Sequence, residues 1–273
     1  MTVASPQPAS SPLRSVVAEA EAMADAADDR AGILTRPARP DELAAVLARF
    51  EATWGVGRGP DRSMLQALEH AGNTVLIAVP RSDDADALGA TLGFLGWSGG
   101  LHLHSHMNAV DPAARGRGIG VALKLRQRAV CLAHGVDEMR WTYDPLIRRN
   151  ARLNLMRLGA EVVAFLPDFY GELGDAITGA DRSDRFEVRW RLGSPRTARA
   201  LALGPLPTWR SEGGLDLVAD FEAVRAADPE VARRLRDASR EAFAVLRPDT
   251  GLRAELDSAG DYVFTRDDPD REA

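Results

Sequence analysis

The chain has 273 residues, of which 45% are hydrophobic, so it can bury the core of one large domain or of one domain with a smaller appendage. Its formal net charge is -6 and its isoelectric point is near 5.5. That balance argues against general nucleic-acid binding, which normally needs a basic surface to displace counterions from phosphates. The single cysteine, Cys131, excludes an internal disulfide and a cysteine-based zinc site, and its apolar neighbours predict a buried helix position.

No stretch of the sequence approaches the ~20 apolar residues that a membrane helix needs. The first residues lack the basic segment and apolar core of a secretory signal. A lone cysteine is typical of a protein from a reducing compartment. We therefore expect a soluble, cytoplasmic protein that binds neither membrane nor nucleic acid.

The first part of the chain is predicted to contain an arm, one strand and two helices. Residues 1–30 begin with Ser, Pro and Ala and then become rich in Ala and acidic residues, which favours a mobile arm with some helical tendency. Residues 32–36 are predicted to form the first strand. Pro40 opens a helix with an apolar face at helical spacing, and residues 61–71 form a second amphipathic helix.

A sheet is predicted in the middle of the chain. Three strands at 74–79, 87–97 and 101–110 follow one another, separated by a polar turn at 81–86 and a hairpin turn at 98–100. A long helix at 119–134, a strand at 138–143, a helix at 147–158 and strands at 160–166 and 184–192 complete the order. An antiparallel meander followed by alternating strands and helices predicts an α+β fold with a mixed sheet covered by helices.

The last part of the chain has a different composition. Residues 193–212 are rich in Pro, Arg and Gly and are predicted to form a linker. Segments at 215–218, 229–246 and 262–264 have the pattern of a strand, a helix and a strand. We therefore expect a main domain over 31–192 and a small α+β unit over 213–273, which caps an acceptor site or forms a dimer surface.

A glycine-rich segment, Arg115-Gly116-Arg117-Gly118-Ile119-Gly120, lies between a predicted strand and the start of the long helix. The first turn of a helix has unpaired N–H groups and a partial positive charge, and glycines let an anion approach closely. A diphosphate can therefore dock there, with Arg115, Arg117 and Lys124 adding positive charge.

Two other phosphate-binding motifs do not fit this segment. A P-loop needs Gly-Lys followed by Ser or Thr, and Ile119-Gly120-Val121 lacks it. A dinucleotide-binding fingerprint needs G-x-G-x-x-G in a parallel βαβ unit, whereas these glycines have another spacing and follow a meander. A plain tight turn stays open as the structural alternative.

The segment resembles a known family. Val110-Asp111-Pro112, followed by Arg115-x-x-Gly118-x-Gly120, is similar to the pyrophosphate-binding motif of the GNAT N-acetyltransferase superfamily, and the resemblance covers about residues 31–192. Within that superfamily the chain resembles a bacterial group of predicted acyltransferases. The matching pieces are His104-Ser105-His106-Met107, Trp141-Thr142-Tyr143-Asp144-Pro145-Leu146, Asn150-Ala151, Leu158-Gly159-Ala160, and Asp184-Arg185-Phe186 with Trp190.

The resemblance implies a splayed sheet and a site for an acyl-CoA, most simply acetyl-CoA. The pantetheine arm is then expected between the strand that ends near Val110 and the strand that ends near Tyr143. The cofactor-binding residues that it implies are Met107, Ala109, Val110, Arg115, Gly116, Arg117, Gly118, Ile119, Gly120 and Asn150. For Asn150, an N-terminal helix cap is the structural alternative.

Three histidines, His102, His104 and His106, alternate along one predicted strand and so share a face. In several GNAT enzymes a catalytic glutamate occupies the position that corresponds to His104, which makes His104 the first candidate for general base and His106 the second. The reference pKa of histidine, ~6.5, suits proton abstraction near neutrality. A polar ladder on a solvated face stays the alternative. A shared metal is not expected, because the outer two positions are ~13 Å apart.

Other candidate residues follow from the resemblance. Many GNAT enzymes have a tyrosine general acid where this chain has Leu155, so the proton for the leaving thiolate is expected from Asn154 through water, from Tyr170 or from solvent. Tyr143 and Asp144 could orient the acceptor amine, although Asp144 precedes Pro145 and suits a plain turn. Arg185 could clamp a substrate carboxylate or pair with Asp184 on the surface. Two tryptophans are expected in the core: Trp141 and Trp190.

The function that these observations favour is transfer of an acyl group from an acyl-CoA to a primary amine on a small molecule, possibly an amino acid, by direct attack in a ternary complex. A buried Cys131 leaves no thiol placed to act as a nucleophile. The alternatives left open are N-succinylation of amino acids, protein or peptide acetylation, and a non-catalytic module that senses acyl-CoA. The expected partner is a small-molecule amine, with a homodimer left open.

Overall fold

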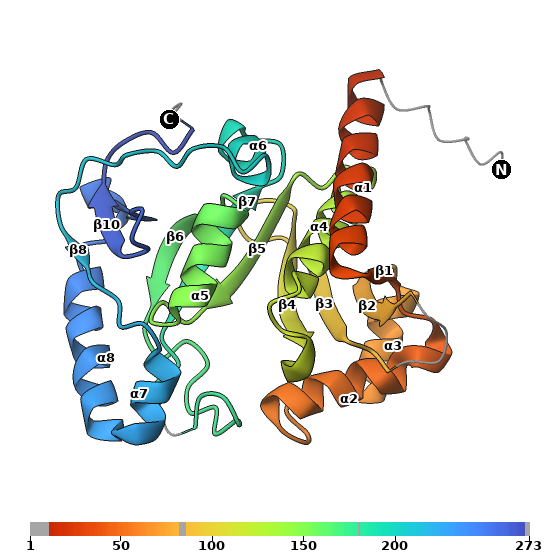
Figure 1. The fold of residues 1–273 in the computed structure, drawn as a ribbon, viewed down its shortest axis with the longest axis horizontal. Coiled ribbons are helices and arrows are strands. Elements are labelled where there is room, and N and C mark those ends of the chain that lie inside the picture. The colour runs from red at the N-terminus through yellow and green to blue at the C-terminus, as the bar shows by residue number, and fades with distance from the viewer. Residues whose placement is uncertain (1–10, 82–85, 180, 271–273) are drawn as a thin grey trace. The chain divides into compact units, whose positions relative to one another are not determined.

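A seven-stranded sheet forms the main part of the structure (Figure 1). The computed structural model describes residues 11–81, 86–179 and 181–270, so the predicted turn at 81–86 lies mostly outside the described residues. The strands, in their order across the sheet, are β1 (Ile33–Pro37), β2 (Thr74–Pro80), β3 (Gly89–Gly96), β4 (His102–Val110), β5 (Glu138–Tyr143), β7 (Arg185–Arg191) and β6 (Glu161–Leu166).

The strand pairings make this sheet mixed and mostly antiparallel. The pair β4 and β5 runs parallel, whereas β1 with β2, β2 with β3, β5 with β7 and β6 with β7 run antiparallel. A second sheet has the order β8 (Gly214–Leu215), β10 (Tyr262–Thr265) and β9 (Arg253–Leu256). The prediction of an α+β fold built on a mixed sheet is therefore confirmed.

The helices follow the predicted order, with additions at both ends of the chain. They are α1 (Ser11–Ala31), α2 (Leu43–Trp54), α3 (Arg62–His70), α4 (Ile119–Ala133), α5 (Arg148–Ala151), α6 (Pro195–Leu201), α7 (Phe221–Ala227) and α8 (Pro229–Phe243). A π-helical segment, Arg152–Arg157, continues α5. In the part of the chain that the structure describes, no helix is long and apolar enough to span a bilayer.

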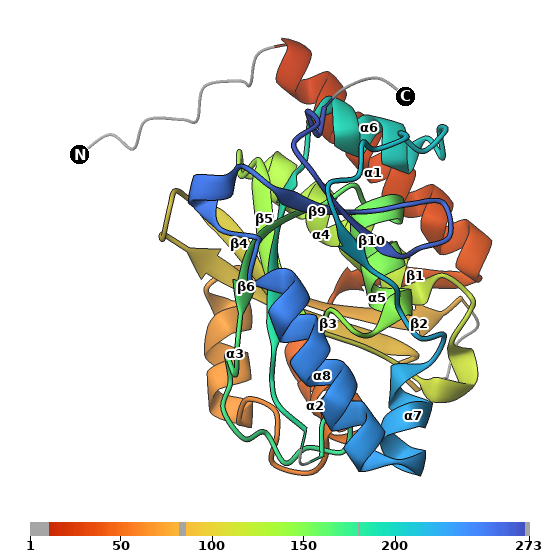
Figure 2. The same ribbon diagram turned by 90° about the vertical axis from the view of Figure 1, so that its left-hand side faces the viewer.

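Helix α1 runs alongside α4 (Figures 1 and 2). Buried Asp28 on α1 accepts hydrogen bonds from the backbone and hydroxyl of Thr35, both at 2.9 Å, and pairs with Arg126 of α4 at 3.0 Å. Arg126 also reaches Asp25 at 2.6 Å. Much of the segment that was expected to be a mobile arm is therefore a packed helix; residues 1–10 lie outside the described residues.

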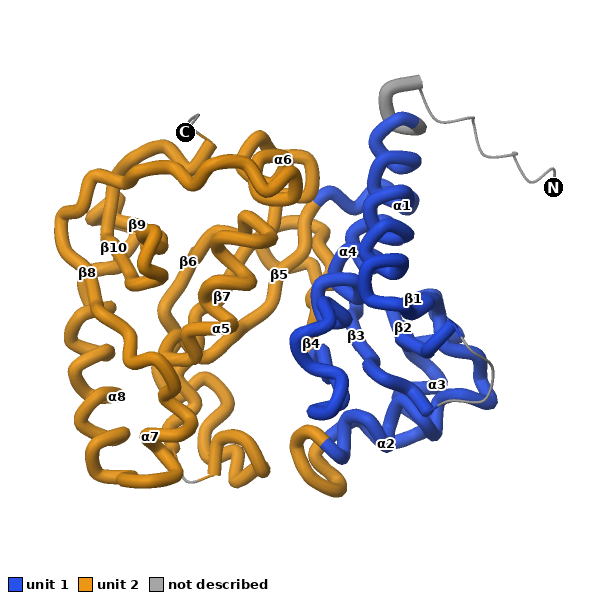
Figure 3. The backbone as a smooth tube through the Cα atoms, in the orientation of Figure 1, with its two compact units in different colours: residues 1–52, 59–94, 107–137 blue, residues 53–58, 95–106, 138–273 orange. Residues whose placement is uncertain are grey.

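Two compact units divide the chain (Figure 3). Unit 1 contains residues 1–52, 59–94 and 107–137, and unit 2 contains residues 53–58, 95–106 and 138–273. The second sheet and α6 to α8 belong to unit 2 together with β5, β6 and β7. The structure thus groups the chain differently from the expected boundaries at 192 and 212.

Unit 1 holds α4 closely against the first strands. A Cβ on Gly89 of β3 would come within about 3.0–3.1 Å of Ile119, Leu123 and the carbonyl oxygen of Ala109, so glycine permits α4 to approach β3 closely. Gln127, fully buried on α4, donates to the hydroxyl of Thr74 at 2.9 Å. These contacts hold α4 against β2 and β3.

Unit 2 buries its core around β7. Phe186, Val188 and Trp190 alternate along this strand and are completely buried, as expected for a half-buried strand. Trp141 packs edge-on against Trp190 at 6.1 Å, so both tryptophans are core residues as predicted. The predicted linker contains α6, whose Arg196 is buried, because this side chain finds its acidic partner on β9.

Candidate functional site

The glycine-rich segment lies in unit 1, where β4 passes through a short 3-10 turn (Pro112–Ala114) into α4. Asp111 caps this turn by accepting the N–H of Ala113 at 2.8 Å, and its carboxylate pairs with Arg49 at 2.8 Å. These hydrogen bonds lower the pKa of Asp111, so the carboxylate stays charged at neutral pH. The entry to the glycine-rich segment is therefore held at a fixed place.

Backbone conformation makes this segment an open cradle. Gly116 and Gly118 have φ values of 81° and 89°. Apart from the adjoining residues, no atom of the described chain lies within 4 Å of the place where a Cβ on either would stand. Gly118 is the N-cap of α4. Within the described chain the amide N–H groups of Gly118, Ile119 and Gly120 have no acceptor, as is normal for the first turn of a helix. Such a helix start can bind an anion.

The basic side chains near this cradle differ in what they can contribute. Arg115 is exposed and forms no ion pair with any described residue. Arg117 donates to the carbonyl oxygen of Ala31 at 2.8 Å and so caps the C-terminal end of α1. Lys124 is 4% exposed, and burial lowers its pKa to about 7. The prediction that Lys124 adds positive charge for a diphosphate at this segment is wrong, because this position of α4 faces the interior.

The end of β4 contributes mainly backbone. The side chains of Met107 and Ala109 are buried, and the carbonyl oxygen of Met107 accepts the hydroxyl of Thr91 at 2.7 Å. Val110 is half-buried, 3.7 Å from where a Cβ on Gly120 would stand. Any contact of Met107 or Ala109 with a ligand must therefore come from main-chain atoms.

Sequence reasoning missed Asn108, which lies between these two buried positions. Its Nδ2 donates to the carbonyl oxygen of Gly120 at 3.2 Å, which ties β4 to the first turn of α4. Its Oδ1 is buried and has no hydrogen-bond partner in the described chain. A buried acceptor without a donor needs an explanation such as a ligand or water. The available signal was a polar residue between apolar neighbours on a strand.

The three histidines lie in unit 2 and have different surroundings. His102 is buried and its Nδ1 lies 2.8 Å from the carbonyl oxygen of Gly100, a structural role in the hairpin. The rings of His104 and His106 are 6.0 Å apart. His104 is half-buried, whereas His106 is exposed, yet the protein around it removes enough solvent to lower its pKa below 6.5.

His104 and His106 also differ in how their strand pairs with β5. The parallel ladder between β4 and β5 consists of Leu103 with Met139 and His104 with Arg140. Both strands continue past this point, β4 to Val110 and β5 to Tyr143, and among the described residues no further pair joins them. His106 lies two residues beyond the last position of β4 that pairs with β5. A splayed sheet was expected from the resemblance.

The end of β5 is held by the C-terminal region. Tyr143 is buried and its hydroxyl lies 3.0 Å from that of Tyr262, which donates to the carbonyl oxygen of Pro145. Burial raises the pKa of Tyr143. Asp144 binds Arg236 through both carboxylate oxygens. Both residues were expected to contact substrate, but their polar groups are already taken by this internal network.

Arg185 has a different setting on β7. Its Nη1 donates to the carbonyl oxygen of Asp184 at 2.9 Å, and its guanidinium lies 5.4 Å from the ring centre of Tyr170. Within the described residues it forms no ion pair, because the Asp184 carboxylate binds Arg240 instead. Burial lowers the pKa of Arg185. The guanidinium therefore has donors left for an anion.

Tyr170 connects this arginine to β5. Its hydroxyl lies 3.1 Å from Oγ1 of Thr142, and its side chain is 39% exposed. The same loop meets residues 53–58, which belong to unit 2: Ala176 donates to the carbonyl oxygen of Trp54 at 3.1 Å, and Arg58 donates to that of Gly174 at 3.2 Å. Tyr170 and Arg185 thus form one polar group in unit 2.

Helix α5 and the π-helical segment place the remaining candidates. Asn150 is the third residue of α5, whose N-cap is Ile147, so the capping alternative for Asn150 is wrong. Asn154 is 4% exposed and its Oδ1 accepts the indole N–H of Trp141 at 3.2 Å. Leu155 is buried. The Asn154 side chain is therefore bound within the core. Of the two residues expected to supply the thiolate's proton, Tyr170 is the accessible one.

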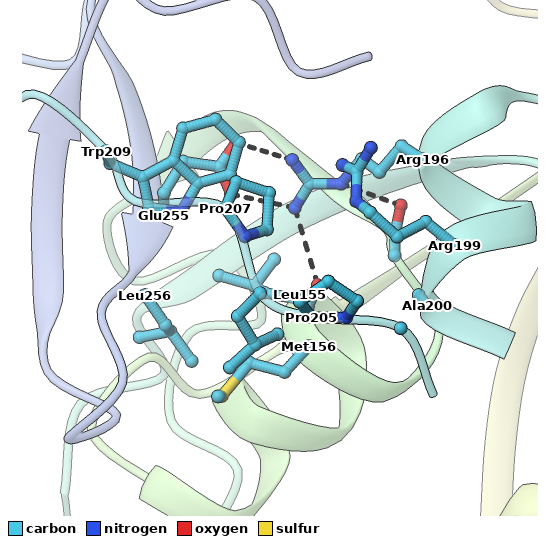
Figure 4. A pocket seen from close by; sticks show the side chains of 13 residues that line it. Leu155, Met156, Arg196, Arg199, Ala200, Pro205, Pro207, Trp209, Glu255 and Leu256 are labelled. Carbon is cyan, nitrogen blue, oxygen red and sulfur yellow. Dashed lines mark hydrogen bonds and ion pairs between the residues drawn. The ribbon is translucent and has the colours of Figure 1, made fainter. Parts of the chain in front are cut away.

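A hollow in unit 2 has no features of a ligand site (Figure 4). It is lined by the π-helical segment, α6, the stretch 204–209 and β9. Arg196 points into it, but this guanidinium is already bound by Glu255 and by the carbonyl oxygens of Gly159 and Ala160. Among the described residues no group of three His, Cys, Asp or Glu side chains is arranged to hold a metal ion.

No protein-family model matches the chain, and no curated protein matches it in sequence. Solved structures do match. The chain is similar to the NatC complex bound to Gag peptide and CoA (17% identity, 58% of this chain and 98% of that chain, TM-score 0.47). It is also similar to a GNAT-family acetyltransferase from Desulfovibrio desulfuricans (18%, 59% and 99%, TM-score 0.43).

A third similar structure is the ribosomal-protein-S18-alanine N-acetyltransferase from Escherichia coli (12% identity, 59% of this chain and 94% of that chain, TM-score 0.47). At this level of similarity the matches identify neither substrate nor partner. A function for the chain has to be argued from its own residues.

Proposed function

We propose that the chain is a GNAT-type N-acyltransferase that transfers an acyl group from an acyl-CoA to the primary amine of a small molecule. The observation that carries the proposal is the cradle before α4. Three consecutive amides, from Gly118 to Gly120, have no acceptor in the described chain. They lie at the start of a 15-residue helix, where Gly116 and Gly118 have left-handed backbone conformations. A diphosphate has the charge and the oxygens that such a cradle binds.

The residues of unit 1 fit the rest of a CoA molecule. Arg115 adds an exposed positive charge beside the diphosphate. The pantetheine arm would run along the backbone of Met107 to Val110. The buried Oδ1 of Asn108 is suited to accept a hydrogen bond from an amide of that arm. The acyl-CoA supplies the acyl group as a thioester, with acetyl as the first group to test and succinyl as the second.

Proton removal from the acceptor amine is assigned to His106, with His104 as the alternative. His106 lies two residues beyond the last position of β4 that pairs with β5, and its lowered pKa keeps the imidazole neutral at pH 7, so that it can accept a proton. The amine nitrogen bonds to the carbonyl carbon, the C–S bond breaks and the amine proton passes to His106. A backbone N–H on this part of β4 would stabilise the developing oxyanion.

The thiolate that leaves needs a proton, and two sources fit. A thiol pKa of about 8.5 means that solvent can supply this proton near neutrality. Tyr170 offers an accessible hydroxyl for the same step. A covalent acyl-enzyme does not fit, because burial raises the pKa of Cys131 to about 12 and leaves it an inert thiol.

Arg185 supports an acceptor that carries a carboxylate, such as an amino acid. Its guanidinium is half-buried, stacked on Tyr170 and without an acidic partner among the described residues. Arginine binds carboxylates through two parallel N–H groups, so this setting suits a single carboxylate.

The test is release of CoA from acetyl-CoA and succinyl-CoA with a panel of amino acids, each paired with the amine that lacks its carboxylate. The proposal predicts turnover with at least one amino acid and much less with its decarboxylated partner. Saturable binding of acyl-CoA without turnover across the panel contradicts the enzyme and leaves a CoA-binding module. Turnover of basic peptides alone contradicts the small-molecule acceptor.

A further inference from the structure

Helix α8 forms ion pairs with both ends of the loop between β6 and β7, residues 167–184. Arg240 binds the two carboxylate oxygens of Asp184 at 2.8 and 2.5 Å and reaches Asp168 at 2.7 Å. Asp184 is fully buried and also accepts the backbone N–H of Asp168 at 3.0 Å. One guanidinium therefore joins the first and last turns of the loop that carries Tyr170.

One helical turn earlier, Arg236 engages the end of β5. It binds both oxygens of Asp144, at 2.8 and 2.7 Å, and Asp181 at 2.7 Å. The arginine is 0% exposed and its guanidinium lies 4.9 Å from the ring centre of Phe221. Asp181 has a second partner in Arg225 at 3.2 Å, so it does not depend on Arg236 alone.

These ion pairs determine which carboxylates could still form an ion pair with Arg185. The charges of Asp144 and Asp175 attract Arg185, and the charge of Arg236 opposes it. Asp175 accepts the backbone N–H groups of Ile177 and Thr178. Because Arg236 occupies both oxygens of Asp144, that carboxylate is not available to close on Arg185. The remaining donors of Arg185, the first residue of β7, are available for an outside anion, next to a loop that Arg240 holds in place.

We infer that Arg236 and Arg240 of α8 are positioning residues that keep Arg185 open as the binding site for the acceptor's carboxylate. The inference rests on the proposed N-acyltransferase function and gives the C-terminal region a role in it. Neither arginine needs to touch substrate: Arg236 restrains a competing carboxylate, and Arg240 fixes the loop.

The experiment measures the Kd of the full chain for amino acids by calorimetry, the acceptor KM in CoA release, and the Kd for acetyl-CoA. The variants are Arg240→Gln, Arg236→Gln and the double variant Asp144→Asn/Arg236→Gln. Arg233→Gln on an exposed stretch of the same helix is the control, because its pairs with Glu230 and Asp237 lie at the surface.

We expect Arg240→Gln and Arg236→Gln each to weaken amino-acid binding and raise the acceptor KM about ten-fold or more, with the acetyl-CoA Kd changed less than about two-fold. The double variant should recover most of the binding, because it removes the carboxylate that Arg236 restrains. A merely structural role predicts no such recovery. If Arg236→Gln does not fold, Arg240→Gln and the double variant still give a result.

Unchanged amino-acid binding in Arg240→Gln, or a double variant that binds no better than Arg236→Gln, overturns the inference. So does a wild-type chain that binds no amino acid, whatever its affinity for acetyl-CoA. A chain that binds amino acids and acetyl-CoA but releases no CoA contradicts the proposed function instead, and the binding data still decide the role of α8.

Discussion

Arg196 and Glu255 lie 59 residues apart in the chain and form a buried ion pair, in which both Nη atoms bind the carboxylate at 2.6 and 2.8 Å. Arg196 is 4% exposed and Glu255 is 2% exposed. The same guanidinium binds the carbonyl oxygens of Gly159 and Ala160. The pair thus joins α6, β9 and the end of the π-helical segment, so the C-terminal strands are built into unit 2.

Glu255→Gln should destabilise the protein by about 3–5 kcal/mol, because it leaves the charge of Arg196 buried without a carboxylate. Urea unfolding followed by circular dichroism measures this loss. Arg233→Ala, which breaks exposed pairs on α8, should cost less than about 1 kcal/mol and is the control. Equal effects of the two substitutions would contradict the account of the buried pair.

Lys124→Met should stabilise the protein at pH 7. Burial lowers the folded-state pKa of Lys124 from 10.5 to about 7, so between these two values the unfolded chain binds a proton that the folded chain releases. Stability of the wild type therefore rises with pH across this window, and the penalty at pH 7 is on the order of 4 kcal/mol. Removing the amine removes the penalty.

Urea unfolding of both proteins at pH 7 and at pH 10 checks this prediction. The difference between wild type and Lys124→Met should be largest at pH 7 and shrink toward pH 10, while other titrating groups cancel. A variant that is less stable than the wild type at pH 7 would show that the amine makes interactions stronger than its desolvation cost.

His106 should set the acid limb of the pH profile for acceptor acylation. Its pKa lies below 6.5, so the neutral base is present at pH 7 and is lost as the pH falls through that pKa. His106→Gln should lower kcat about 100-fold or more and remove this limb. The pH dependence of kcat/KM with both proteins is the measurement. If His104→Gln removes the limb and His106→Gln does not, the base is His104.

Arg185→Lys should raise the acceptor KM about ten-fold with little change in the acetyl-CoA Kd, because lysine keeps the charge but loses the two-pronged geometry. Steady-state kinetics with an amino acid and with the amine that lacks its carboxylate measure the effect, which should be confined to the amino acid. Arg182→Lys in the adjoining loop is the matched control, since Arg182 forms an exposed pair with Asp237. An equal loss for both substrates contradicts a carboxylate site.

Local patterns were sufficient to predict most of the main sheet. Strand β5 has the predicted bounds, and β7 buries the predicted alternate residues, because both properties depend on neighbours two positions away. Helix α6 was missed because its composition is that of a linker. A local signal was present, because the hydroxyl of Ser194 caps the helix and Pro195 opens it. The burial of Arg196 against Glu255 had no local signal.

In the candidate site, too, some features were predictable from local sequence and others depend on residues far apart in the chain. The cradle from Gly116 to Gly120 was predictable, since glycine spacing and a helix start are local features. The ion pair of Asp144 was not predictable, because its partner Arg236 lies 92 residues later in the chain. The choice between His104 and His106 depends on where β4 stops pairing with β5, which is a property of the register and not of either residue.

The two ends of α4 offer the most direct test of the central claim. Gly118 and Gly135 have φ values of 89° and 72°, and, apart from the adjoining residues, neither has an atom of the described chain within 4 Å of the place where a Cβ would stand. Alanine at either position should cost about 1–2 kcal/mol of stability for the left-handed backbone. Calorimetric titration with acetyl-CoA should then show binding weakened about ten-fold or more in Gly118→Ala and unchanged in Gly135→Ala. Equal affinity in all three proteins, or no saturable binding by the wild type, would contradict a diphosphate site at the start of α4.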